Sequence, residues 1–273
     1  MRAVPNQATQ AIGPVIFLDH ILEKRFAPGE MPTPNGSFAH PHRGIATFSY
    51  LLKGAVTHFD SNGGHGTVTA GGVQWMNAGN GIIHDEMLSK ELRDAGGDFY
   101  AFQFWVNLPA KNKAEAPDYM PLAAEELPVV DLGEGKAVLK VLLGAYNGAV
   151  SPIPTFTEQF IWHLHLEAGA RIDLPTVGGH EYGGYLPIGR AVVNGATVSD
   201  KQFLLFDTDG DGITAENPTD AALDLFVFGG APYAEPMVAH GPFVMNTEAE
   251  IHQAYADARV GKYGRINYHG HLD

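Results

Sequence analysis

Short apolar runs alternate with turn residues over most of the chain. Between Ile45 and Trp105 the sequence reads ATFSYLLKG, AVTHFD, TVTAGGVQWM and DFYAFQFWVNLP, and the runs are rich in β-branched and aromatic residues. Runs of this kind, bounded by Gly, Asn and Pro, predict strands joined by tight turns. Their regular spacing indicates an antiparallel sandwich or barrel. The 33 Gly and 18 Pro are spread along the whole chain, which also favours many short strands.

The second half of the chain repeats this pattern after an interruption. Residues 110–128, AKNKAEAPDYMPLAAEELP, have no sheet pattern and predict a linker with one short helical turn. Strand-like runs then resume as KAVLKVLLG, FIWHLHLEAGARIDLP, GGYLPIGRAVVNG, QFLLFD and DLFVFGG. We therefore expect two β domains, at 1–130 and 131–240, followed by a helix and tail at 241–273 that pack on the barrels.

The C-terminal stretch carries a helical pattern instead. Thr247 and Glu250 have the spacing of a capping box, and Gly261 ends the run. The apolar positions between them, spaced i, i+3, i+4 and i+7, are Ile251, Ala254, Tyr255 and Ala258. This pattern predicts an amphipathic helix over about Glu248 to Arg259 that packs through its apolar face.

Charge and cysteine content narrow the class of protein. The chain has 17 Lys and Arg against 31 Asp and Glu, a formal net charge of −14, which disfavours binding to nucleic acids and to anionic membranes. The absence of cysteine excludes disulfides, thiolate metal sites and a catalytic thiol. No stretch approaches the ~18 apolar residues of a membrane span, and the first residues lack the apolar core of a signal peptide. We expect a cytoplasmic protein.

Two pairs of ligand-type side chains recur at the same spacing. His40 and His42 lie in FAHPHRG, and His84 and Glu86 lie in NAGNGIIHDEM. Side chains at i and i+2 of a strand point to the same face. Three imidazoles and one carboxylate suit a first-row transition metal and leave one or two positions open. A lone His-x-His is more often a pair of surface or core histidines without a metal. The second pair favours a metal site, because burying Glu86 without a cation would be costly.

The longer motifs around these pairs resemble the pirins, which are two-domain members of the cupin superfamily. The resemblance rests on HPHRG, YLLKG, GGVQWMNAGNGIIHDEM and FQFWVNLPAKNKAEAPDY, with GPVIFLDH near the start and EPMVAHGPFVMNTEAEIHQA near the end. It spans nearly the whole chain. It implies an all-β fold of two tandem cupin (jelly-roll type) β-barrels and one mononuclear metal site in the N-terminal barrel. Its metal ligands would be His40, His42, His84 and Glu86.

The resemblance also implies two possible functions. The first is an iron-dependent dioxygenase that cleaves quercetin-like flavonols with O2, with Glu86 as catalytic base. The second is an iron- or redox-dependent regulatory protein that binds a protein partner without turnover. The resemblance points to Fe(II) as the single divalent metal, and Ni, Mn, Co, Cu or Zn would also fit the ligand set. The sequence does not separate the two functions, and it leaves the oligomeric state open.

The chain departs from the family pattern at three positions. Cupins usually carry Glu where this chain has Ala46, and pirins usually have Asp and Arg where it has Gly72 and Asn80. None of these positions is an implied ligand of the pirin site. The departures therefore leave the implied metal ligands unchanged and put in doubt which substrate the site accepts.

The second domain contains histidines that mimic the first site. His163 and His165 form another His-x-His, and His180 precedes Glu181, but no later pair matches His84 and Glu86. We expect these histidines to be hydrogen-bonded on a strand face and the second domain to hold no metal. The run DTDGDGITAENP resembles a calcium loop, but Pro218 takes the place of the final Glu, which predicts a surface turn.

Four further large side chains have more than one interpretation. The tryptophans in strand-like runs, expected in the core, are Trp75, Trp105 and Trp162. Trp75 is also near the implied ligands in sequence. Arg43 follows the first ligand pair, and it either contacts an anionic substrate or pairs with an acidic side chain.

Overall fold

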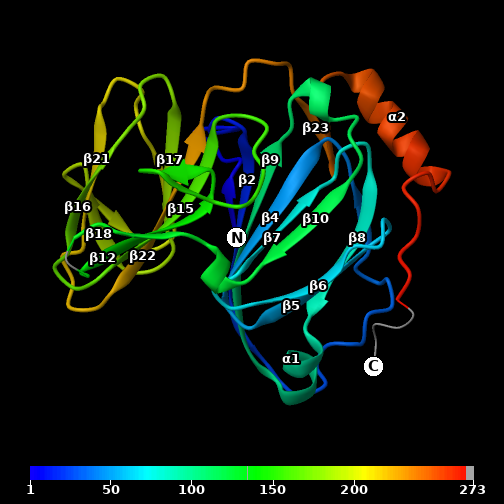
Figure 1. Cartoon of the computed structure of the whole chain (residues 1–273), viewed down its shortest axis with the longest axis horizontal. Helices are drawn as coiled ribbons and strands as arrows, with labels where there is room; N and C mark the ends of the chain where they lie inside the picture. Colours follow the sequence, from blue (N-terminus) through cyan, green and yellow to red (C-terminus); the bar gives the residue numbers. More distant parts are fainter. Residues whose placement is uncertain (134, 269–273) are drawn as a thin grey trace. The chain divides into compact units, whose positions relative to one another are not determined.

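The computed structural model describes residues 1–133 and 135–268, and most of their regular structure is β-strand. The two α-helices among these residues are α1 (Lys90–Ala95) and α2 (Glu248–Arg259) (Figure 1). Internal contacts divide the described residues into two compact units. Among the described residues, unit 1 comprises Met1, 21–125 and 234–268, and unit 2 comprises 2–20 and 126–233. The domain limits expected at residues 130 and 240 remain a prediction.

Unit 1 is a barrel built from two antiparallel sheets (Figure 1). In the first sheet the strand order is β2 (Val15–Phe26), of which unit 1 holds the residues from Ile21, then β9 (Gly97–Asn107), β4 (Ile45–Lys53), β7 (Val73–Asn77) and β10 (Asp118–Leu122). In the second sheet the order is β3 (His40–His42), β8 (Ile82–Leu88), β5 (Ala55–Asp60) and β6 (His65–Thr69). Apolar side chains from both sheets meet in a buried cluster of Leu51, Val56, Val68, Leu88, Phe99 and Ala101. Burial of this cluster stabilises the barrel that carries the candidate site.

The C-terminal part of unit 1 consists of β23 (Val238–His240), β24 (Phe243–Met245) and α2. Thr247 and Glu250 form the predicted capping box, in which Thr247 Oγ1 accepts from the Glu250 amide at 3.3 Å. Ile251 and Ala254 are buried in a cluster that also holds Phe243, and Tyr255 and Ala258 pack against it. The predicted helix, its cap and its apolar face are therefore confirmed.

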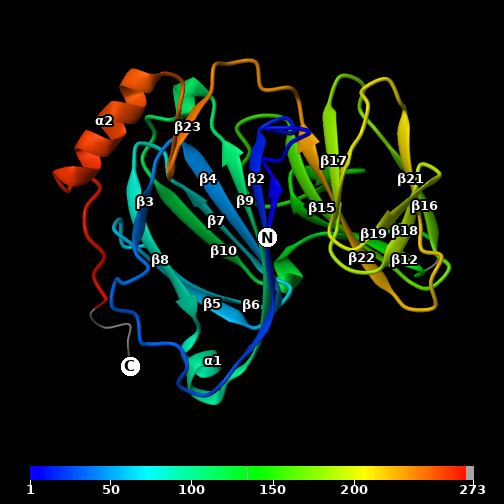
Figure 2. The ribbon, with the colours of Figure 1, turned by 180° about the vertical axis from the view of Figure 1, so that it is seen from behind.

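Unit 2 is a second two-sheet barrel (Figure 2). Its larger sheet has the order β11 (Val129–Asp131), β12 (Ala137–Leu143), β15 (Gln159–Leu166), β22 (Leu223–Gly230), β17 (Glu181–Leu186) and β20 (Gln202–Leu205). Its smaller sheet has the order β16 (Arg171–Pro175), β21 (Gly212–Glu216), β18 (Arg190–Val193) and β19 (Ala196–Ser199). The remaining strands are β1 (Arg2–Val4), which pairs with β2, and the hairpin β13 (Ala145–Tyr146) and β14 (Ala149–Val150). The all-β fold of two cupin barrels with a short C-terminal helix is thus confirmed.

The expected linker at 110–128 is wrong in part. Its start forms the expected short turn, a 3-10 helix at Ala110–Asn112, but Asp118–Leu122 forms strand β10 and pairs with all five residues of β7. β10 is an edge strand, which tolerates Pro121 because one side of the strand needs no ladder partner. Pairing with β7, rather than local propensity, decides this strand.

Two other expectations can be compared with the structure. The first part of the calcium-like run, residues 207–211, lies in an exposed turn between β20 and β21, as predicted, but residues 212–216 form strand β21, in which Ile213 and Ala215 are buried. Among residues 1–133 and 135–268, no helix combines the length and apolar character needed to cross a membrane.

Candidate metal centre

Strands β3 and β8 bring three of the predicted histidines together. β3 pairs antiparallel with β8, with His40 opposite His84, and the alternation along β3 puts His42 on the same face as His40. The Nε2 atoms of His40 and His84 are 3.1 Å apart. The His42 ring centroid lies 4.8 Å from that of His40 and 5.0 Å from that of His84. The three imidazoles form a group in which one ligand atom from each lies within 4.8 Å of the others.

Glu86 lies two residues after His84 and belongs to a second, overlapping group with His84 and His58. Its carboxylate is held by amide donors on two strands. Gln103 Nε2 donates to Oε2 at 2.9 Å, and Gln74 Nε2 makes a short contact with Oε1. His84 is therefore shared between a three-histidine group and a group that contains the carboxylate.

His58 and Tyr119 are site residues that the sequence reasoning missed. His58 lies on β5 directly opposite Glu86 on β8, and His58 Nε2 is 3.0 Å from Asp60 Oδ2. Tyr119, from the unpredicted strand β10, stacks on the His58 ring with centroids 3.9 Å apart. A signal was present for one of them, because His58 and Asp60 repeat the i, i+2 spacing of the two predicted pairs.

Tyr119 also reaches the carboxylate indirectly. Its hydroxyl donates to Gln74 Oε1 at 3.1 Å, and this orients the amide that contacts Glu86. Burial raises the pKa of Tyr119 far above its ordinary value, and the nearby Glu86 carboxylate adds to this shift. The phenol therefore remains a hydrogen-bond donor throughout the physiological pH range.

Burial keeps the inner histidines neutral. His42 is 2% exposed and His84 is fully buried, whereas His40 is exposed and marks the solvent side of the group. Burial, assisted by His40, lowers the pKa of His42 to about 3, and burial also lowers the pKa of His84 well below its ordinary value. Neutral imidazoles keep a lone pair for a metal ion.

Backbone carbonyls orient two of the rings. His40 Nδ1 is 2.8 Å from the Phe38 carbonyl oxygen, and His42 Nδ1 is 3.2 Å from that of Pro242. A carbonyl can only accept, so each Nδ1 carries the proton and each Nε2 keeps its lone pair. His84 Nδ1 is buried and has no hydrogen-bond partner among the described residues.

The C-terminal segment packs directly against the first histidine motif. Arg43 donates to Asp257 of α2 at 2.9 Å, which settles the alternatives for Arg43 in favour of an acidic partner. Gly44 has φ of +80°, and a Cβ at this position would overlap the carbonyl oxygen of Val244. The glycine thus allows the close approach that places Pro242 beside His42.

Two of the departures from the family pattern lie in defined surroundings. Ala46 is fully buried in β4, opposite Asn77 and Val106. Asn80 is exposed, and its amide donates to the Glu115 carbonyl at 2.9 Å. Ala46 thus lies inside the barrel wall, and Asn80 lies at the surface.

The histidines of unit 2 have acidic partners. Asp224 Oδ1 lies 2.9 Å from His163 Nε2 and 2.8 Å from His165 Nδ1. His180 Nε2 lies 2.9 Å from Glu158 Oε2. The prediction of hydrogen-bonded histidines is confirmed.

The tryptophans differ in their surroundings. Trp75 and Trp162 are buried at 1% and 5% exposure, as predicted for core residues. Trp105 is only partly buried, and its ring meets His42 edge-on with centroids 5.1 Å apart. The core position expected for Trp105 is therefore confirmed only in part, because β9 turns this side chain towards the histidine group.

Comparison with known proteins supports the same family along both units. The family model Pirin matches residues 1–106, and the Pirin C-terminal cupin domain matches 161–264. A pirin-like protein of Solanum lycopersicum is 34% identical over 265 residues, which cover 96% of this chain and 86% of the relative. A pirin-like protein of Caulobacter vibrioides is 36% identical over 228 residues, which cover 82% and 79%. The crystal structure of a quercetin 2,3-dioxygenase from Acinetobacter baumannii matches with a TM-score of 0.88 at 34% identity, covering 96% of this chain and 90% of that one.

Proposed function

Since the chain belongs to the pirin family, we propose that it is an iron-dependent dioxygenase that cleaves a quercetin-like flavonol with O2. The observation that carries the proposal is the group of three imidazoles at β3 and β8, next to the carboxylate of Glu86. The choice of substrate class is supported by the quercetin 2,3-dioxygenase from Acinetobacter baumannii, to which 96% of this chain is similar.

The residues fit a divalent metal ion. Two nitrogens bound to one ion at about 2.1 Å, at roughly a right angle, lie about 3 Å apart, and the His40 and His84 Nε2 atoms are 3.1 Å apart. The proposed ligands are His40, His42, His84 and Glu86. His58 is the neighbour that shares His84 and Glu86 in the second group, and it is the competing candidate.

When bound, Fe(II) would supply Lewis acidity towards the enol oxygen of the flavonol and redox activity towards O2. Glu86 would accept the proton of the enol hydroxyl, because a carboxylate is the basic group next to the histidines. Gln74 and Gln103 hold both carboxylate oxygens and so fix the direction from which the proton is taken. Exposed His40 leaves the substrate an approach from solvent.

The test measures metal content and O2 uptake together. Protein loaded anaerobically with Fe(II) should hold one equivalent and consume O2 with quercetin. His40→Ala and His84→Ala should lose most of the metal, whereas His58→Gln should retain it. His165→Ala is the matched control, because His165 is hydrogen-bonded to Asp224 in unit 2, and this variant should behave as wild type.

Two outcomes would contradict the proposal. Loss of metal in His58→Gln, with retention in His40→Ala, would move the site to the second group. A fully loaded wild-type protein that consumes no O2 with any flavonol tested would favour the alternative of an iron- or redox-dependent regulatory protein that binds a protein partner.

A further inference from the structure

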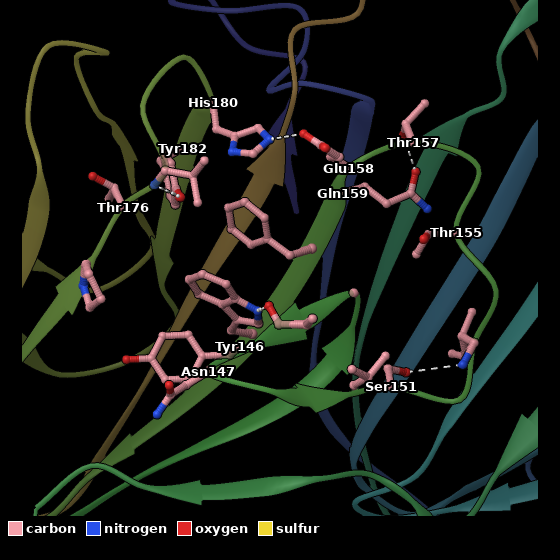
Figure 3. A pocket seen from close by; sticks show the side chains of 18 residues that line it. Tyr146, Asn147, Ser151, Thr155, Thr157, Glu158, Gln159, Thr176, His180 and Tyr182 are labelled. Carbon is pink, nitrogen blue, oxygen red and sulfur yellow. Dashed lines mark hydrogen bonds and ion pairs between the residues drawn. The ribbon is translucent and has the colours of Figure 1, made fainter.

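Unit 2 contains a pocket of about 610 Å³ that the histidine group does not use (Figure 3). The pocket is lined by residues of the β13–β14 hairpin, of the segment that leads into β15, and of the segment that leads into β17. Its volume falls in the range of about 300–1,000 Å³ typical of small-molecule sites. The pocket belongs to a part of the chain for which the sequence indicated no chemistry beyond paired histidines.

Aromatic rings form one side of the pocket. Phe160 and Trp162 stack with ring centroids 4.2 Å apart, and Tyr146 meets Trp162 edge-on at 5.1 Å. Trp162 Nε1 donates to the Ala145 carbonyl at 3.2 Å, which fixes the indole in place. Tyr182 completes this side, with its ring 4.9 Å from that of Phe160. A rigid wall of aromatic rings favours a flat ligand, because planar π systems gain dispersion and stacking energy against it.

Two polar atoms in the lining are buried and have no hydrogen-bond partner among the described residues. The first is Nε2 of Gln159, a residue only 4% exposed. Thr157 Oγ1 donates to Gln159 Oε1 at 2.7 Å, so the amide is oriented and its NH2 group is left as a donor (Figure 3). An unsatisfied buried donor destabilises the protein, because the group has lost its hydrogen bonds to water without gaining a protein partner. A ligand with an acceptor oxygen would remove this cost.

The second atom is Nδ1 of His180. His180 Nε2 lies 2.9 Å from the Glu158 carboxylate, which can only accept, so Nε2 carries a proton, and in the neutral ring Nδ1 is an acceptor (Figure 3). A ligand hydroxyl would satisfy Nδ1. The pocket therefore presents a donor and an acceptor beside a wall of aromatic rings.

We propose that this pocket binds a planar hydroxylated aromatic molecule that also carries a carbonyl oxygen, at a site separate from the histidine group. The ring system would lie against the aromatic wall formed by Tyr146, Phe160, Trp162 and Tyr182. Both side chains would turn towards the ligand on binding, because the two atoms are buried; the carbonyl would then accept from Gln159 Nε2, and the hydroxyl would donate to His180 Nδ1. The inference rests on unit 2 alone and does not depend on the proposed dioxygenase activity.

The test uses 7-hydroxy-4-methylcoumarin, a bicyclic phenol with a lactone carbonyl, in isothermal titration calorimetry with the full chain. Wild type should bind one equivalent. Thr155→Trp, at an exposed position of the lining, should fill the pocket and weaken binding at least ~10-fold, because a bulky indole replaces the ligand volume. Thr197→Trp is the matched control, at an exposed position of β19 outside the lining, and should bind as wild type.

A second variant guards against misfolding of the first. His180→Phe keeps a flat ring but removes the acceptor, and it should also weaken binding at least ~10-fold, because a site built to bond a hydroxyl discriminates through that bond. Absence of binding to wild type, or equal binding to wild type, Thr155→Trp and His180→Phe, would overturn the proposal. Loss of binding in His84→Ala would overturn it too, since it would place the probe at the histidine group.

Discussion

Arg43 and Asp257 are 214 residues apart in sequence and form an ion pair of 2.9 Å in unit 1. Arg43 directly follows the His40–His42 motif, and Asp257 lies on the buried side of α2. Tyr263 lies within 3.4 Å of the same guanidinium nitrogen through its hydroxyl. The C-terminal helix is therefore attached to the strand that carries two of the proposed ligands.

Breaking this pair should loosen the C-terminal segment. In Asp257→Asn the charge is lost while the shape is kept, and the unfolding temperature should fall by several degrees, with faster hydrogen exchange in α2. Asp94→Asn is the control, since Asp94 pairs with Lys90 on an exposed surface of α1, where such pairs contribute about 0.3–0.5 kcal/mol. Equal effects of the two substitutions would show that the Arg43 contact has no special role.

The glycine after the motif should be intolerant of a side chain. Gly44 and Gly63 both have positive φ, at +80° and +90°, but a Cβ on Gly63 would meet nothing within 4 Å. Gly63→Ala should thus lower the free energy of unfolding by only about 1–2 kcal/mol, the strain of a left-handed backbone at a non-glycine residue. Gly44→Ala should cost clearly more and lower metal content, because Val244 would have to move away together with Pro242, the partner of His42. Urea unfolding and metal analysis of both variants check this, and similar costs would argue against the close packing.

Orientation of Glu86 should matter for turnover more than for metal binding. Gln103→Leu removes the donor to Glu86 Oε2, so the carboxylate can rotate away from the substrate. Flavonol-dependent O2 uptake should fall about 10–100-fold, as is typical of residues that orient a metal ligand, and one equivalent of iron should remain. Gln7→Leu, on an exposed part of the chain, should have no effect. An unchanged rate of O2 uptake in Gln103→Leu would show that the hydrogen bond that orients Glu86 does not contribute to turnover.

Acid should destabilise the protein through His20. His20 is buried beside Tyr185, with His20 Nδ1 2.9 Å from the hydroxyl, and burial, together with nearby positive charge, lowers its pKa from 6.5 to about 4. In the unfolded chain His20 becomes protonated near pH 6.5, whereas in the folded chain it becomes protonated only near pH 4. The free energy of unfolding therefore keeps its full His20 contribution above pH 6.5 and loses it as the pH falls from 6.5 to about 4.

His20→Gln isolates this contribution. Between pH 7.5 and pH 5, wild type should lose about 2 kcal/mol more unfolding free energy than the variant, given ~1.36 kcal/mol per pKa unit over 1.5 units. His252→Gln, at an exposed position of α2, is the control and should lose as much unfolding free energy between the two pH values as wild type. Urea unfolding at the two pH values provides the measurement, and parallel losses in wild type and His20→Gln would contradict the assignment.

The sequence by itself determined those features that depend on local period. The alternation that predicts strands, the i, i+2 spacing of the histidines, and the capping box and apolar face of α2 all involve residues within a few positions of each other. Their geometry follows from the rise and side-chain period of one element, so no tertiary information was needed to predict them. The family motifs added the double barrel, which the fold confirms.

Only the tertiary structure decided which distant residues meet. Strand pairing put His58 opposite Glu86 and recruited Tyr119 from a segment predicted to be a linker. In unit 2, the pairing of β15 with β22 set Phe160 and Trp162 against the pocket. These outcomes depend on which strands become neighbours, and that choice is made by burial summed over a whole barrel rather than by any short stretch of sequence.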